Sequence, residues 1–227
     1  MASESSGQPD IRTLVLVEGP SDAAAVGALA SRLGLEMGLD TTLHHIQISS
    51  AGGITNFSRV LAGFARAAPS ARLCGLYDTA VGGEWHVRRA LAAAATPIAA
   101  HQSPESAGFF ACVADLEDEL IGALGTQAVE RVLEEQGELH SFRRFQAMPK
   151  HRGSPVHRQL HRFLGTRATR KIRCAKLLVE KLDLAKPGGL PRPFAGLANH
   201  LVAAAQSIVP RNAHMLSRSG SAPVRPR

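Results

Sequence analysis

Five carboxylates follow segments of the sequence that are typical of buried β-strands. They are Glu18, Asp22, Asp78, Asp115 and Glu117. Because the carboxyl ends of parallel strands meet at one edge of a sheet, we expect these side chains to converge there. Oxygen ligands without Cys or His favour Mg²⁺ or Mn²⁺ over zinc, and five carboxylates are enough for two ions. Beside a basic surface, such ions suit phosphodiester chemistry.

The first two of these acids also have a simpler interpretation. Glu18 follows the apolar run 13–17, and Ser21 or Asp22 can cap a helix that begins there. Taken alone, this stretch fits a capped helix beside one solvated glutamate as well as it fits a pair of ligands. The acids that end the later strands favour the shared site.

The elements that position the acids alternate between strand and helix. We expect strands at residues 13–17, 42–50, 72–78 and 109–114. We expect helices at residues 22–33, 54–68 and 84–95. This alternation predicts an α/β fold with a central parallel sheet flanked by helices. Gly19, Gly52 and Gly53 are predicted to form the turns that close the first two strands.

Helices dominate the rest of the chain. They are expected at residues 120–138, 157–164, 170–182 and 194–208. Because Pro149, Gly153 and Pro155 interrupt the basic segment 141–176, we expect that segment to begin as a loop. The predicted organisation is a disordered tail over 1–10, an α/β core over 11–138, a basic helical extension over 139–209 that completes the domain, and a disordered basic tail over 210–227.

Charge is divided unevenly along the chain. Residues 1–140 hold 8 Lys/Arg and 17 Asp/Glu, a balance of −9, whereas residues 141–227 hold 18 and 2, a balance of +16. This polarity predicts a polyanionic partner, which we expect to be nucleic acid, with DNA favoured. The candidate phosphate contacts are Arg143, Arg144, Lys150, Arg152, Arg167, Arg170 and Arg173. No run suits a membrane span and the start is not signal-like, so we expect a cytoplasmic protein without a membrane partner.

The order of the acidic stretches resembles the TOPRIM domain, in the version found at the end of OLD-family (overcoming lysogenization defect) nucleases. The resemblance covers about residues 13–210 and is carried by Val17-Glu-Gly-Pro-Ser-Asp22, Gly52-Gly53, Asp78 and Asp115-Leu-Glu117. It implies a Rossmann-like fold and a nuclease or nucleotidyl transferase whose five carboxylates bind two divalent ions. It also implies that Glu18 relays a proton to the leaving oxygen and that Lys171 stabilises the transition state. Lys171 is equally consistent with one more phosphate contact in a basic helix.

Two departures from that family are visible. Many TOPRIM proteins carry D-x-D after the third strand, but here the sequence is Asp78-Thr79-Ala80, and Glu84 is either a substitute or the start of a helix. The sequence has no G-x-x-x-x-G-K-[ST] motif, which implies a stand-alone TOPRIM protein whose ATP control would come from a separate ATPase subunit. The missing acid keeps a second hypothesis open, a catalytically decayed TOPRIM module that binds nucleic acid or regulates another protein.

Other functions match less well. Tyr77 is the only tyrosine and is expected to point away from the face of Asp78, which argues against topoisomerase chemistry. A receiver-type phospho-switch would lack the D-x-E pair. His157 and His161 have the spacing of a zinc helix without its catalytic Glu, so interfacial or phosphate-facing histidines are favoured.

Aromatic and sulfur-containing side chains are expected mainly in the core. They are Trp85, Phe109, Phe110, Phe142, Phe145, Cys74, Cys112 and Cys174. Because the cysteines form no C-x-x-C pair, neither a zinc knuckle nor a disulfide framework is predicted.

Overall fold

A four-stranded parallel sheet forms the centre of the protein, whose computed structural model describes residues 12–35 and 46–206. The strands are β1 (Thr13–Val17), β2 (Ile46–Ser50), β3 (Arg72–Asp78) and β4 (Phe109–Cys112). Their order is β2-β1-β3-β4, and each neighbouring pair is parallel. The expected α/β fold, with helices around a central parallel sheet, is confirmed.

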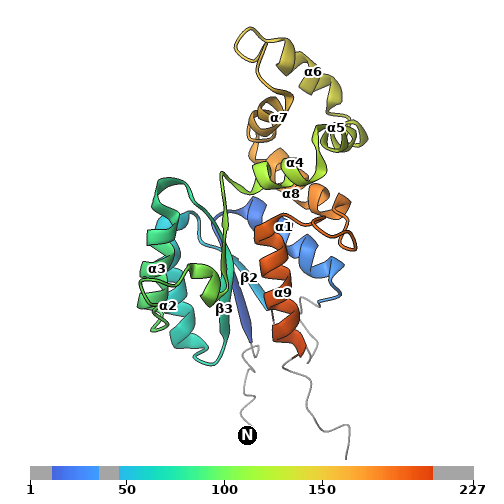
Figure 1. Ribbon diagram of the computed structural model, residues 1–227. Coiled ribbons are helices and arrows are strands. Elements are labelled where there is room, and N and C mark those ends of the chain that lie inside the picture. Colours follow the sequence, from blue (N-terminus) through green and yellow to red (C-terminus); the bar gives the residue numbers. More distant parts are fainter. Residues whose placement is uncertain (1–11, 36–45, 207–227) are drawn as a thin grey trace, which may run out of the picture.

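Helices cover both faces of the sheet (Figure 1). On one face lie α1 (Pro20–Arg32), with α8 (Ala168–Lys181) packed beside it, and α9 (Arg192–Gln206), and on the other lie α2 (Phe57–Ala67) and α3 (Gly83–Ala93). Val15 and Val17 pack into the first layer and Leu16 into the second, because neighbouring strand residues point to opposite faces. Every residue of β1 is therefore buried, which explains its unbroken apolar sequence.

A group of helices extends beyond the carboxyl ends of the strands. α4 (Leu116–Leu124) leads from β4 into α5 (Thr126–Glu135), α6 (Leu139–Ala147) and α7 (Val156–Leu164). We call residues 126–164 the helical lobe, and its three helices lie together at one end of the molecule in Figure 1. Phe142 and Leu160 of the lobe belong to the same buried cluster as Val15 of the sheet. The lobe and the sheet therefore share a hydrophobic core.

The structure corrects two predictions about the lobe. The first residues of the basic segment 141–176, expected to form a loop, belong to α6, because Phe142 and Phe145 recur at helical spacing and both are buried. The prolines that suggested a loop all follow this helix. The single helix expected over 120–138 is divided at Gly125, whose φ of +77° favours glycine.

Most of the predicted core side chains are buried. Phe109, Phe142 and Phe145 are buried, as are all three cysteines, and Phe110 packs against the core. Trp85 is an exception, because its side chain is 58% exposed. The core positions of α3 are occupied by Val87, Ala90 and Leu91 instead.

Some predictions fall on parts of the chain that the structure does not describe. The tails predicted at 1–10 and 210–227 lie outside the described residues, as do positions 42–45 of the second predicted strand and 207–209 of the extension. Within the described part of the chain, no helix has both the length and the apolar character to cross a bilayer.

Candidate active site

The first acids lie where the strand order reverses. After β1 the chain forms β2 on one side of it and then β3 on the other. Open α/β sheets bind ligands at the carboxyl ends of strands at such a point. Here Oε1 of Glu18, just after β1, accepts a hydrogen bond of 2.8 Å from the backbone N–H of Asp78, at the end of β3. The two strand ends are thus joined through a carboxylate.

The turn at Gly52 and Gly53 holds the backbone beside Glu18. The N–H of Gly53 donates to the Glu18 carbonyl at 2.9 Å, and the two glycines have φ of +70° and +113°. These angles favour glycine, as the sequence predicted. Gly19 differs, because its φ of −133° suits any residue. Gly19 is the N-cap of α1, and its N–H donates to the carboxylate of Asp22 at 2.8 Å.

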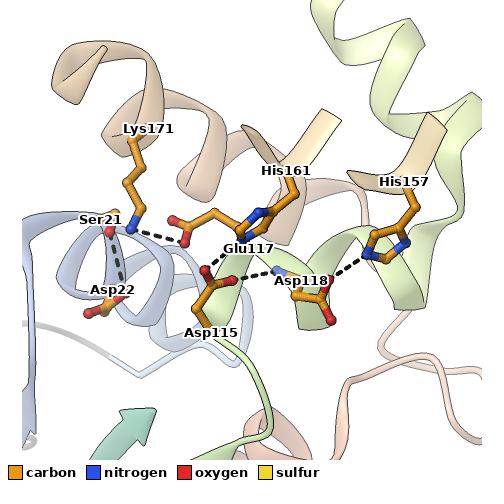
Figure 2. Close-up of polar contacts among 8 residues, drawn as sticks. All are labelled: Ser21, Asp22, Asp115, Glu117, Asp118, His157, His161 and Lys171. Atoms are coloured by element: carbon orange, nitrogen blue, oxygen red, sulfur yellow. Dashed lines mark hydrogen bonds and ion pairs between the residues drawn. The ribbon is translucent and has the colours of Figure 1, made fainter. Parts of the chain in front are cut away.

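The start of α4 supplies two further acids. Asp115 is the N-cap of α4 and accepts a 2.9 Å hydrogen bond from the N–H of Asp118. Glu117, in the first turn, is 3% exposed, and its Oε2 lies 3.1 Å from Nζ of Lys171 (Figure 2). The other oxygen of Glu117 is buried and has no hydrogen-bond partner among the described residues. A buried oxygen of this kind is costly unless a ligand satisfies it.

Lys171 reaches the acids because α1 and α8 run side by side. Arg32, in the last turn of α1, donates to the carbonyls of Val179 and Leu182 at the end of α8, at 2.7 and 2.6 Å. About three turns earlier in each helix lie Asp22 of α1 and Lys171 of α8. Figure 2 shows Lys171 extending from α8 toward the acids of α1 and α4. Its ammonium therefore lies against carboxylates rather than on an outward basic face.

The acids disfavour one another's charged forms. Burial raises the pKa of Asp78 to about 8, and four neighbouring carboxylates add to the rise. These neighbours are Glu18, Asp22, Asp115 and Glu117. Burial also raises the pKa values of Glu18, Asp22 and Glu117. Burial favours the neutral amine of Lys171, but attraction to the carboxylates outweighs burial and raises the pKa of Lys171, so the ammonium is retained.

The donor set fits a hard divalent cation. Carboxylate oxygens are the ligands that Mg²⁺ and Mn²⁺ prefer, and a cation would relieve both the repulsion around Asp78 and the unpaired oxygen of Glu117. Within the described residues, no three His, Cys, Asp or Glu side chains already converge as a complete ligand set. The acids are partly neutralised by the protein's own cations instead, Glu117 by Lys171.

Two histidines of α7 also contact the acids of α4. Nε2 of His161 lies 2.6 Å from Oδ2 of Asp115, and Nε2 of His157 lies 2.6 Å from Oδ1 of Asp118 (Figure 2). The i, i+4 spacing of the histidines matches the i, i+3 spacing of the aspartates across the two helices. Sequence reasoning favoured interfacial histidines but missed that His161 contacts a candidate ligand. The paired spacings were the available signal.

The acid missing after the third strand is not replaced by Glu84. The Glu84 carboxylate lies 2.8 Å from the guanidinium of Arg88 within α3, and its side chain is 55% exposed. Thr79 and Ala80 are exposed, and the Thr79 hydroxyl donates to the carbonyl of Val113, which joins the ends of β3 and β4. The acidic edge, as we call it, therefore consists of Glu18, Asp22, Asp78, Asp115 and Glu117.

One predicted phosphate contact, Arg170, requires correction. Arg170 is 5% exposed and its guanidinium binds the carboxylate of Glu138. It also donates to the carbonyl of Phe163 at 3.1 Å, and its Cζ lies 3.9 Å from the centroid of the Phe163 ring. A buried guanidinium with these partners stabilises the junction of α8 and the helical lobe, and it is not accessible to a phosphate.

The remaining basic candidates divide into paired and unpaired side chains. Arg143 binds Glu130, and Arg173 binds Glu138, although both arginines stay about half exposed. Four of the predicted phosphate contacts are exposed and have no carboxylate partner in the described part of the chain: Arg144, Lys150, Arg152 and Arg167. The surface available to a phosphate backbone is therefore smaller than the count of basic residues suggests.

This architecture has counterparts among solved structures. The C-terminal region of the Xanthomonas campestris pv. campestris OLD protein, in a structure phased with mercury, is similar with a TM-score of 0.60 and 18% identity, over 87% of this chain and 97% of that chain. This chain has the OLD C-terminal fold. The C-terminal region of the Burkholderia pseudomallei OLD protein is also similar, with a TM-score of 0.56 and 17% identity, over 86% of this chain and 98% of that chain. The sequence matches no protein-family model, and no curated protein matches it.

At these identities the likeness establishes the fold alone. The resemblance to the OLD C-terminal region, inferred from the order of the acids, is confirmed at that level. The chemistry of the acidic edge has to be argued from this chain's own residues.

Proposed function

We propose that this protein is an OLD-like nuclease that hydrolyses phosphodiester bonds in nucleic acid, most favourably DNA, with the help of divalent cations. The proposal is carried by the acidic edge, where one oxygen of Glu117 is buried without a hydrogen-bond partner among the described residues and burial raises the pKa of Asp78 to about 8. The ionised form of such a carboxylate cluster is unfavourable without a bound cation and becomes favourable when a cation binds. The OLD C-terminal fold supports the same conclusion.

The residues of the chain would divide the work. The five carboxylates of the acidic edge would hold two Mg²⁺ or Mn²⁺ ions. When bound, such ions polarise a phosphoryl oxygen, lower the pKa of water and neutralise a leaving oxygen. Lys171, charged beside Glu117, would stabilise negative charge that develops on the phosphoryl group. Glu18, whose pKa is raised by burial, would take the proton released by the attacking water and pass it to the leaving oxygen.

The exposed cations would hold the sugar–phosphate backbone. Arg167 is the N-cap residue of α8 and precedes Lys171 by about one turn, so a backbone bound there would lead toward the acidic edge. Lys150 and Arg152 lie in the loop between α6 and α7. Contacts of this kind position a nucleic acid without selecting its sequence.

The test is a nicking assay on supercoiled plasmid with Mg²⁺ or Mn²⁺. We expect the protein to nick the plasmid, and Asp78→Ala and Glu18→Gln to reduce the rate by at least about 100-fold. Glu180→Gln is the matched control, because Glu180 is an exposed carboxylate on α8 whose nearest cation is Lys176 at 3.8 Å. EDTA should abolish nicking by every variant.

A second function, nucleic-acid binding without catalysis, is favoured by one observation. The third strand is followed by Ala80 where the resembled family often has an acid, and Glu84 is engaged by Arg88. Retarded migration of plasmid on a gel, with no nicking under either metal, would support this alternative and contradict the nuclease.

A further inference from the structure

The most exposed aromatic side chain described in the protein is Trp85. It is the only tryptophan in the chain, it is 58% exposed, and it lies in the first turn of α3. Val87 and Leu91 face the core, which leaves Trp85 on the outer side of the helix. A large aromatic ring gains free energy when it leaves water, so its exposure points to a binding role.

The helix that carries Trp85 begins beside the acidic edge. Gly83, the first residue of α3, packs so tightly on the end of β3 that a Cβ there would lie 1.9 Å from the carbonyl oxygen of Asp78. Trp85 follows two residues later. The next residue, His86, is close enough to Glu18 for the two side chains to interact electrostatically. The start of α3 is therefore fixed beside Asp78 and Glu18.

A cation accompanies the exposed ring. Cζ of Arg89 lies 5.4 Å from the centroid of the Trp85 ring, and Arg89 is exposed. No carboxylate of the described residues pairs with Arg89, whereas the neighbouring Arg88 binds Glu84 and the carbonyl of Gln102. An aromatic face beside an unpaired guanidinium matches a nucleotide, whose base stacks and whose phosphate is negative.

Two other exposed apolar side chains are close in sequence to residues of the candidate site. Val113, two residues before Asp115, is 77% exposed, and Ile172, next to Lys171, is 37% exposed. Exposed apolar residues thus follow β4 and lie on α3 and α8, near in sequence to the candidate site. Apolar surface beside a phosphate-binding site suits bases rather than phosphates.

We propose that Trp85 stacks on an unpaired base of the nucleic acid, next to the phosphate held at the acidic edge. The bases inside a duplex are already stacked on both faces, so only an unpaired base presents a free face to an indole ring. The inference rests on the proposed function for its nucleic-acid substrate. It narrows that substrate to single strands or to sites where a duplex is locally open.

The test uses the intrinsic fluorescence of Trp85, which has a single source in this chain. The full chain in EDTA is titrated with a short single strand of thymidine nucleotides, so that binding is observed without cleavage. We expect quenching of the fluorescence on binding. By anisotropy of a labelled strand, Trp85→Ala should weaken binding by roughly 5- to 100-fold and Trp85→Phe by much less, because phenylalanine still stacks.

Three controls separate stacking from charge. A sugar–phosphate strand of the same length without bases should bind without quenching, and a blunt duplex should quench less than the single strand. Met148→Ala removes another exposed apolar side chain, at the C-terminal end of α6, and should bind like the unmodified protein. Because Trp85 is mostly exposed, its variants should melt at nearly the unmodified temperature.

Unchanged fluorescence together with unchanged affinity of Trp85→Ala would overturn the inference, as would equal quenching by the duplex. These outcomes are independent of the nicking assay. If the protein nicks plasmid but the Trp85 fluorescence does not change on binding, the proposed function stands and the stacking role does not. Quenching by single strands without any nicking would support the stacking role and contradict the nuclease.

Discussion

The acidic edge and the helical lobe carry opposite charges and compensate them differently. At the edge, burial raises the pKa of Asp78 to about 8, and the surrounding carboxylates add to the rise. In the lobe, Arg143 is paired with Glu130, and at its junction with α8, Arg170 is paired with Glu138. The charges of the edge are therefore not fully compensated by the protein, whereas three of the seven predicted phosphate contacts, Arg143, Arg170 and Arg173, are already paired with carboxylates. This difference agrees with the cation proposed for the edge, and it leaves Arg144, Lys150, Arg152 and Arg167 as the predicted phosphate contacts without a carboxylate partner among the described residues.

The largest effect is expected from removing the ion pair between Arg170 and Glu138. Arg170→Met removes a guanidinium that is 5% exposed and that donates to the carbonyl of Phe163. Arg173 would still bind Glu138, so no buried charge is left entirely unpaired. We therefore expect the free energy of unfolding to fall by about 2–4 kcal/mol, at or below the usual cost of breaking a buried pair. Urea denaturation followed by circular dichroism measures it.

The control for this substitution is Arg144→Met. Arg144 is exposed on α6 and has no carboxylate partner among the described residues, so its loss should change stability by no more than about 0.5 kcal/mol. Equal stability of the two variants would mean that the Arg170 pair does not hold the lobe.

An effect of opposite sign is expected at the acidic edge. The pKa of Asp78 is raised from 3.8 to about 8, so the folded state binds this proton more tightly than the unfolded state. The stabilisation from the protonated form is complete below about pH 4 and is lost as the pH rises through about 8. Asp78→Asn avoids this loss. In EDTA at pH 8 we expect the free energy of unfolding of Asp78→Asn to exceed that of the unmodified protein by about 1–2 kcal/mol, after allowance for solvent screening.

Melting curves in EDTA at pH 4 to 8 test this prediction. The advantage of Asp78→Asn, a few degrees at pH 8, should shrink as the pH falls, because Asp78 then becomes neutral. Added Mg²⁺ should stabilise the unmodified protein more than the variant, which lacks a ligand charge. Glu180→Gln should show neither trend. A variant less stable than the unmodified protein in EDTA would mean that the edge tolerates its charges without a cation.

The sequence predicted the acidic edge better than the basic segment 141–176, and the reason is physical. β1 and β3 have the expected bounds because buried parallel strands have continuous apolar sequences. Once strand ends are known, the parallel sheet brings Glu18 and Asp78 together whatever the sequence between them. The hydrogen bond between Glu18 and Asp78 is a direct result of this topology.

The errors concern side chains whose surroundings depend on tertiary packing. Arg170 looked like its basic neighbours, and no local pattern indicates that Glu138, 32 residues earlier, would bury it. Trp85 was assigned to the core from its residue type, but smaller residues of α3 occupy that face. The loop predicted before α7 began too early in the sequence. Pro149 follows the end of α6, so it does not prevent that helix from forming. Periodicity gives the face of a helix, whereas ion pairing across helices requires the fold.

A smaller effect on metal affinity is expected from His161. Its Nε2 lies 2.6 Å from Asp115, and a ligating carboxylate held by a hydrogen bond keeps its orientation. His161→Ala should therefore weaken Mn²⁺ binding by about tenfold in isothermal titration calorimetry. His157→Ala is the matched variant, since His157 lies at the same distance from Asp118, outside the acidic edge. Tighter Mn²⁺ binding by His161→Ala would show that the imidazole competes with the cation for Asp115.

The smallest effect is expected from replacing single cations of the basic segment 141–176. If Arg167 contacts a phosphate, Arg167→Gln should reduce the slope of log affinity against log salt by about 1, or about fivefold in affinity at 0.15 M salt. Arg143→Gln should change the slope less, because the guanidinium of Arg143 already lies 2.6 Å from a carboxylate oxygen of Glu130. Fluorescence anisotropy of a labelled DNA strand in EDTA measures both slopes. Equal changes would mean that paired arginines still release counterions on binding, and the contrast between compensated and uncompensated charge would then fail for the basic segment 141–176.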